Sequence, residues 1–152
     1  MLTRIRDFFR THLQLPSEHG GRDPEHALRS AAAALLLEMT RMDPDSQADE
    51  REAVTAAVRG HFGLSSEEAE ELIACAEAEH AEATDYFQFT SLINRAYTSH
   101  QKAELIELLW RIAFADEQLH RYEEHLVRRV AELLYVPHSV FIAAKHRAQG
   151  GG

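Results

Sequence analysis

The sequence has almost no glycine or proline across its central and C-terminal parts. Of its seven glycines and four prolines, none but Pro137 lies between Gly63 and Gly150. A β-rich domain needs turn residues about every 8–12 positions, and glycine and proline supply most of them. The scarcity of both therefore predicts that this long stretch is helical.

Cysteine, long apolar runs and excess positive charge are also missing. The one cysteine, Cys75, cannot form an internal disulfide or a zinc–cysteine cluster. No run approaches the ~18 apolar residues of a membrane helix, and the N-terminus lacks the apolar core of a signal peptide. Lys and Arg number 16 against 25 Asp and Glu, a formal charge of −9. This charge argues against nucleic acid and anionic membranes as partners, and we expect one soluble, cytoplasmic protein.

Apolar residues recur at helical spacing, as in Leu105, Ile106, Leu109 and Ile112. The caps expected at helix ends are Ser65 with Glu68, Thr84 and Ser99, with Gly63 ending the preceding helix. The predicted fold class is all-α, a compact bundle of about seven or eight helices. Their predicted ranges are 2–13, 24–41, 47–61, 66–83, 85–97, 100–114, 120–135 and 138–148.

The first helix differs from the others in its charge. In residues 1–13 an apolar side that includes Phe8 and Phe9 lies opposite three arginines, and residues 14–23 form a polar linker. We interpret this amphipathic helix as an appendage of a helical body over residues 24–149. Its apolar side is expected to pack on that body or on a second subunit in a homodimer. A membrane surface is the less favoured partner.

A weak internal repeat brings out two acidic segments. Sliding the sequence along itself places Asp43 over Asp116 and Glu50 over Glu123, each pair between an apolar helix and an amphipathic one. Neither segment is an EF-hand loop. That loop needs glycine at position 6 and glutamate at position 12, and valine stands at the twelfth position of both segments.

The second segment and its flanks, residues 90–97, 104–116 and 122–130, resemble the tellurite-resistance protein B (TerB) family. The first segment, with the residues 62–68 that follow it, is similar too. The resemblance implies an all-helical fold of two pseudo-symmetric halves, whose acidic loops converge on a surface proposed to hold divalent metal. It also implies a relation to the N-terminal domain of a membrane-anchored DnaJ-like co-chaperone. Pro44 and Glu117 stand where the family usually has glycine.

Two interpretations of the acidic segments remain open. Their carboxylates offer hard oxygen ligands for Ca²⁺, Mg²⁺, Mn²⁺ or, with His120, Zn²⁺. The candidate metal ligands are Asp43, Asp45, Glu50, Asp116, Glu117 and Glu123. Alternatively, the aspartates accept hydrogen bonds from loop amides, and Glu50 and Glu123 stabilise the starts of helices. The second role requires no metal.

The functional expectation is a non-enzymatic interaction or sensor module in a stress response, with a protein partner. The alternative is a metal-dependent carboxylate enzyme, because Glu77-x-x-His80 and Glu117-x-x-His120 have the spacing of a di-iron bundle. Glu117 and His120 are expected in a loop, which argues against that site. The acidic run from Glu67 to Asp85 is interpreted as a solvated face, or else as a surface for a basic partner.

Overall fold

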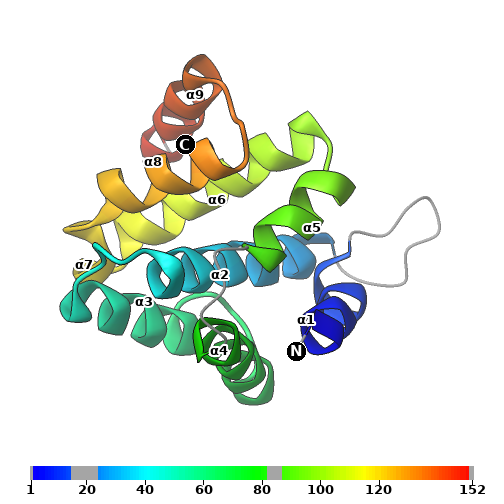
Figure 1. Ribbon diagram of the computed structural model, residues 1–152. Helices are drawn as coiled ribbons and strands as arrows, with labels where there is room; N and C mark the ends of the chain where they lie inside the picture. The colour runs from blue at the N-terminus through cyan, green and yellow to red at the C-terminus, as the bar shows by residue number, and fades with distance from the viewer. Residues whose placement is uncertain (1, 15–23, 82–86, 151–152) are drawn as a thin grey trace.

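The computed structural model describes residues 2–14, 24–81 and 87–150 (Figure 1). These residues form α-helices and one π-helical turn, η1, and no strand occurs among them. The elements in chain order are α1 (Leu2–Phe8), η1 (Phe9–Leu13), α2 (Pro24–Met42), α3 (Ala48–Gly60), α4 (Ser66–Ala81), α5 (Gln88–Ala96), α6 (Ser99–Ala115), α7 (Glu117–His120), α8 (Glu123–Leu133) and α9 (His138–Gln149). The predicted all-α fold class is therefore confirmed.

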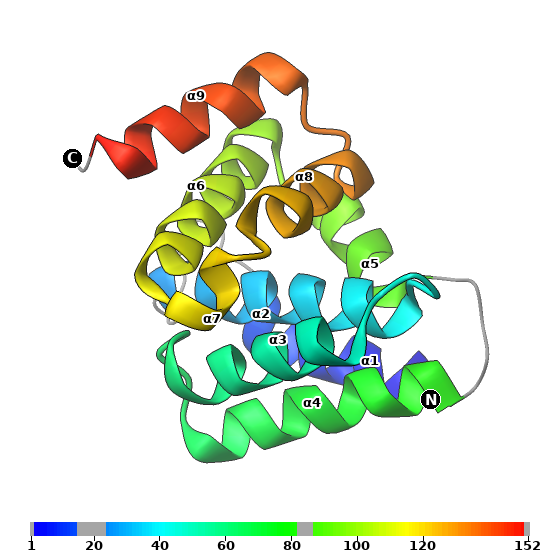
Figure 2. The same ribbon diagram turned by 90° about the vertical axis from the view of Figure 1, so that its left-hand side faces the viewer.

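Helix α2 forms the centre of the molecule. Figures 1 and 2 show it between α6, α8 and α9 on one side and α1, α3 and α4 on the other. Its middle, from Ala31 to Leu37, is apolar on every side and wholly buried. A helix that is hydrophobic all round is stable only when neighbours cover it on all sides, so this segment fixes the layered arrangement.

The first helix is part of the core rather than an appendage. Ile5, Phe8, Phe9 and Leu13 are buried in the same apolar cluster as the rest of the chain. The hydroxyl of Tyr97 donates a hydrogen bond to the carbonyl oxygen of Leu13. The apolar side of the first helix is therefore packed on the chain's own body. The linker over 14–23 lies outside the described residues except for Gln14, and no helix in the described part is long and apolar enough to cross a membrane.

The predicted start of the helix over residues 120–135 is wrong. A separate short helix, α7, begins at Glu117, and α8 begins only at Glu123. Glu117 and His120 therefore lie in a helix and not in a loop. The physical reason is the side chain of Asp116, which accepts hydrogen bonds from the amides of Gln118 and Leu119 and so nucleates the extra turn.

Other helix ends follow their predicted caps only in part. Ser65 and Glu68 form the expected capping box, and Gly63 has a positive φ of 72°. The cap of α6 is Thr98 rather than Ser99, because Thr98 and Gln101 exchange reciprocal bonds. The predicted cap Thr84 and residues 82–86 lie outside the described residues, and α5 begins at Gln88.

One backbone conformation departs from what its side chain favours. Tyr135 has a φ of 60°, in the left-handed region where glycine is preferred. The amides of Tyr135 and Val136 donate to the carbonyls of Glu132 and Ala131, the bonding pattern of a Schellman motif that ends α8. The side chain is 82% exposed, so packing contributes little to hold this conformation.

Candidate functional site

The first acidic segment, between α2 and α3, is a tight turn stabilised by its own aspartate. One carboxylate oxygen of Asp43 accepts a hydrogen bond from the amide of Asp45 at 2.9 Å, and its carbonyl accepts one from the amide of Ser46 at 3.1 Å. The side chain of Asp45 is exposed. Asp43 therefore has the loop-stabilising role that was one of the two interpretations.

The second acidic segment is organised by Asp116, which is 6% exposed. Its Oδ1 accepts hydrogen bonds from the amides of Gln118 at 2.9 Å and Leu119 at 3.0 Å. Its Oδ2 lies 3.5 Å from Nε2 of His61, at the end of α3. Asp116 thus caps α7 with one oxygen and faces the first half of the chain with the other.

Glu50 lies in the first turn of α3 and Glu123 in the first turn of α8, where the non-metal interpretation placed them, and each also lies close to a histidine. Buried Glu50 accepts a hydrogen bond from the Ser46 hydroxyl at 3.3 Å and lies 3.5 Å from Nε2 of His125 on α8. Glu123 lies 3.0 Å from Nδ1 of His120. Burial raises the pKa of Glu123, against the opposing effect of His120.

The segments lie side by side, but they do not assemble a metal site within the described chain. Glu50 with His125 and Asp116 with His61 are contacts that join the two halves. Nowhere in residues 2–14, 24–79 and 87–150 do three His, Cys, Asp or Glu side chains gather closely enough to hold an ion. The fit to a divalent cation is therefore poor, and binding by these carboxylates stays a prediction.

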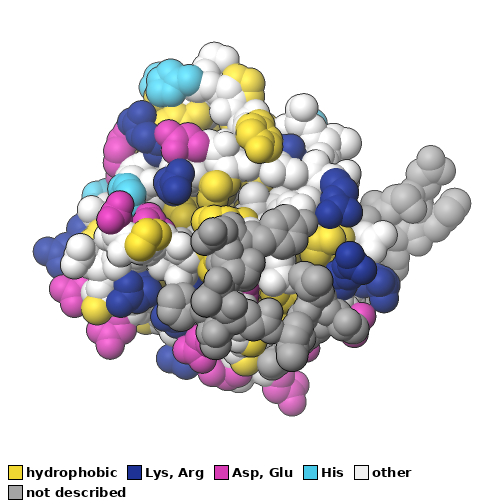
Figure 3. Space-filling model, viewed as in Figure 1, with side chains coloured by type: hydrophobic (Ala, Val, Ile, Leu, Met, Phe, Trp, Pro, Cys, Tyr) yellow, Lys and Arg dark blue, Asp and Glu magenta, His cyan; other side chains and the backbone are white. Residues whose placement is uncertain are grey.

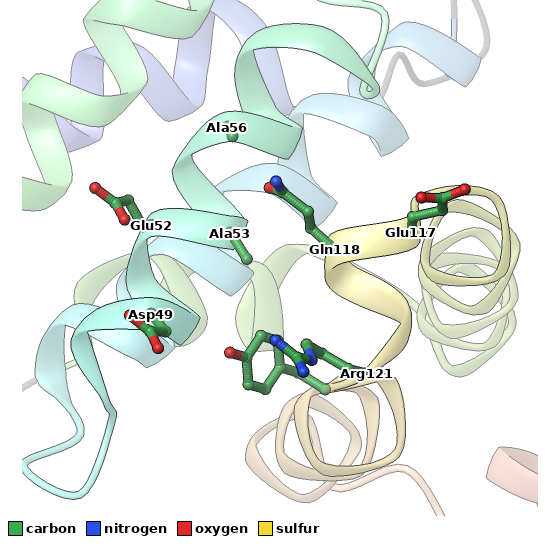
Figure 4. Close-up of a pocket in the computed structure, with 8 residues that line it drawn as sticks. Asp49, Glu52, Ala53, Ala56, Glu117, Gln118 and Arg121 are labelled. Carbon is green, nitrogen blue, oxygen red and sulfur yellow. The ribbon is translucent and has the colours of Figure 1, made fainter.

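A groove of about 540 Å³ opens between α3 and α7, next to both acidic segments (Figure 4). Ala53 and Ala56 of α3 face Gln118 of α7 across it, and Arg121 points into the gap. Its lining comprises Asp49, Glu52, Ala53, Ala56, Glu117, Gln118, Arg121 and Tyr122. Three carboxylates against one guanidinium give the groove an acidic excess.

The charged groups around this end of the molecule are mixed in sign. Figure 3 shows acidic and basic side chains intermingled over the end that α3 and α7 occupy in Figure 1. The selectivity of this surface for a ligand therefore depends on the local groove and not on a broad field of one sign.

Two buried glutamates were not identified from the sequence. Glu38 is 0% exposed and Glu79 1%, although Glu79 belongs to the acidic run predicted to be a solvated face. That prediction is wrong for Glu79. The position of Glu38 carried a signal: a single charge inside the apolar run from Leu35 to Met39 must be buried with it. Cys75 is buried in the core, as expected.

The fold and the acidic loops define the class of protein as a small all-helical domain with two helix–loop–helix segments. The family model "Tellurite resistance protein TerB" matches residues 29–146. This chain belongs to the TerB family, as the resemblance of its acidic segments predicted. No curated protein and no solved structure matches the chain. The helix over residues 2–13 lies outside the family match.

Proposed function

We propose that this chain is a non-enzymatic interaction domain of the TerB type that binds a protein partner in the groove between α3 and α7. The observation that carries the proposal is the groove itself, to which both acidic segments contribute side chains. Asp49 and Glu52 come from the first half, and Glu117 from the second. A partner seated there contacts both halves at once.

The contacts made by the other loop carboxylates support a binding role rather than a catalytic one. Asp43, Glu50 and Asp116 hold loop amides, a hydroxyl or histidines. A hydrolytic metal centre requires carboxylates that converge on an ion with an open position for water. The carboxylates at the groove, by contrast, are exposed and offer charge to a ligand: Asp49, Glu52 and Glu117.

The chemistry of the groove favours a segment that brings a basic side chain over an apolar floor. Ala53 and Ala56 are short enough to admit a side chain between the helices. A lysine or arginine there neutralises the acidic excess at the rim. We propose that such a partner acts in the stress response that the name of the family denotes, and a second copy of the chain is the competing occupant.

The test places a photo-crosslinking amino acid at Gln118 in cells. The captured protein is identified, purified and titrated into the domain by calorimetry. A Glu52→Gln/Glu117→Gln variant is expected to weaken binding about three- to tenfold, since each exposed charge pair contributes roughly 0.2–1 kcal/mol. The matched control is Glu132→Gln on α8, which removes an exposed charge remote from the groove lining.

Equal affinities for the groove variant and the control would contradict the proposed site. Capture of a second copy of the chain, with dimer formation in analytical ultracentrifugation, would replace the basic partner with a homodimer. Divalent-metal-dependent turnover of a substrate by the purified domain would contradict the non-enzymatic role.

A further inference from the structure

Two glutamates from other helices accept hydrogen bonds from the first turn of α5. Glu38 on α2 and Glu79 on α4 are fully buried and approach α5 from two directions. A buried carboxylate loses its hydration, so it persists only where donors or a proton compensate. Neither residue takes part in the groove between α3 and α7.

The amides of the first turn of α5 supply those donors. The amide of Gln88 donates to Oε2 of Glu79 at 2.9 Å, and the amide of Phe89 donates to Oε2 of Glu38 at 2.7 Å. The amide and hydroxyl of Thr90 both donate to Oε1 of Glu38, at 2.9 and 2.7 Å. Helix α5 has no side-chain cap of its own at Phe87, so distant glutamates perform that task.

The two carboxyl groups are neighbours, because they accept hydrogen bonds from the consecutive amides of Gln88 and Phe89, and Glu79 influences the protonation of Glu38. Two ionised carboxylates this close together in a buried site repel each other, so we infer that one of them holds a proton. Both oxygens of Glu38 already accept N–H groups, which is the pattern of an ionised carboxylate. We therefore assign the proton to Glu79, whose Oε2 accepts only the amide of Gln88 among the α5 amides.

We propose that Glu38 and Glu79 share a single proton and act as a pH-dependent clamp that holds the first turn of α5 against α2 and α4. When the proton is present, the acid–carboxylate pair joins three helices. When it is lost, two adjacent buried carboxylates repel each other and the first turn of α5 is released.

Burial raises the pKa of Glu38, and its bonds with Glu79, Thr90 and Phe89 lower it. Because each carboxyl influences the protonation of the other, Glu38 and Glu79 titrate as a pair. A carboxyl whose pKa is raised on folding contributes stability below its unfolded pKa. That contribution is lost as the pH rises through the folded pKa, so the clamp opens on the alkaline side.

The surroundings of the pair are mostly apolar or already bonded. From α1, the ring of Phe8 packs edge-on against Phe89 with centroids 6.2 Å apart. The charged Asp7 and Arg10 of the first helix are exposed and paired with each other. On α2, Arg41 is held by Glu77 of α4 at 3.4 Å and by Thr55 of α3.

The test compares one substitution at both positions. In Glu79→Gln the side-chain amide keeps a donor toward Glu38 and an acceptor for Gln88, so we expect a folded protein without the alkaline loss of stability. In Glu38→Gln the side-chain NH₂ group faces the amide donors of α5 and cannot accept from them, so we expect a loss of folding stability at every pH. Between the unfolded pKa and the raised folded pKa, each pH unit should lower the folding constant of the wild type by up to about tenfold relative to Glu79→Gln.

Hydrogen exchange of the Gln88, Phe89 and Thr90 amides locates the effect, with the amides of α6 as the internal control. Exchange at α5 should accelerate with pH faster in the wild type than in Glu79→Gln. Carbon-13 NMR of the wild-type glutamate carboxyls should show one protonated group at neutral pH. Two ionised carboxylates there, equal effects of the two substitutions, or a wild-type pH profile in Glu79→Gln would each overturn the proposal. If Glu38→Gln does not fold, the comparison of the wild type with Glu79→Gln and the NMR of the wild-type carboxyls still test the proposal.

Discussion

Replacement of Asp116 by alanine distinguishes a helix cap from a metal ligand. The substitution removes the acceptor for the amides of Gln118 and Leu119, and Leu119 is 1% exposed. Loss of an N-cap costs about 0.5–2 kcal/mol, and a buried amide left without an acceptor costs about 1–3 kcal/mol. Since the two costs overlap, we expect a loss of about 2 kcal/mol in the free energy of unfolding.

For a chain of this size that loss corresponds to a fall in melting temperature of about 4–8 °C. Thermal and urea unfolding followed by circular dichroism at constant protein concentration measure both quantities. Asp116→Asn keeps an acceptor oxygen, so its loss should be less than half as large. The matched control is Asp45→Ala, because Asp45 lies in the corresponding segment but its exposed carboxylate accepts no hydrogen bond from the described residues. Its effect should stay within about 0.5 kcal/mol.

The same curves, recorded with chelator and with millimolar Ca²⁺, Mg²⁺, Mn²⁺ or Zn²⁺, test the metal hypothesis. If Asp116 acts as a helix cap, Asp116→Ala should lose the same free energy of unfolding in every condition. The melting temperature of the wild type should then not rise when metal is added. An ion bound at a hundredfold excess over its Kd would add about 2.7 kcal/mol to the stability of the folded state. A metal-dependent rise in the wild type that Asp116→Asn abolishes would refute the cap as its main role.

Three further substitutions test other parts of the structure. Tyr135→Gly should raise stability by about 0.5–1 kcal/mol in urea unfolding, because it removes the cost of a left-handed tyrosine; Tyr135→Ala, which keeps a Cβ there, should gain nothing. Glu123→Gln should become more stable relative to the wild type as the pH rises, since burial raises the pKa of Glu123; a constant difference in melting temperature across pH would contradict this. Phe8→Ala should cost about 3–5 kcal/mol in the same assay, and a loss below about 1 kcal/mol would show that the first helix is not part of the core.

The helical fold could be predicted because its signals are local. The scarcity of glycine and proline and the helical spacing of apolar residues are properties of neighbours along the chain. The box of Ser65 and Glu68 likewise joins residues within one turn, and it was placed correctly. The extra helix α7 was missed because four residues are too few to show periodicity, and its formation depends on the cap from Asp116.

The use made of each acidic residue could not be read in the same way. Asp43 and Asp116 have partners two or three residues away, so their loop-stabilising role was among the predicted ones. Glu50 faces His125 across the two halves, a contact that no local pattern contains. The pseudo-symmetry of the halves stays a prediction.

The sequence by itself determined the fold class, the family and the places where acidic segments interrupt the helices, since these depend on composition and local spacing. Only the tertiary structure decided which carboxylates are solvated and which are buried. Glu77 and Glu79 lie on the same helix, yet one is largely exposed and the other 1% exposed beside Glu38. The charge state of a carboxyl depends on donors and charges within a few ångströms, and for Glu38 those groups are supplied by residues about fifty positions away in the chain.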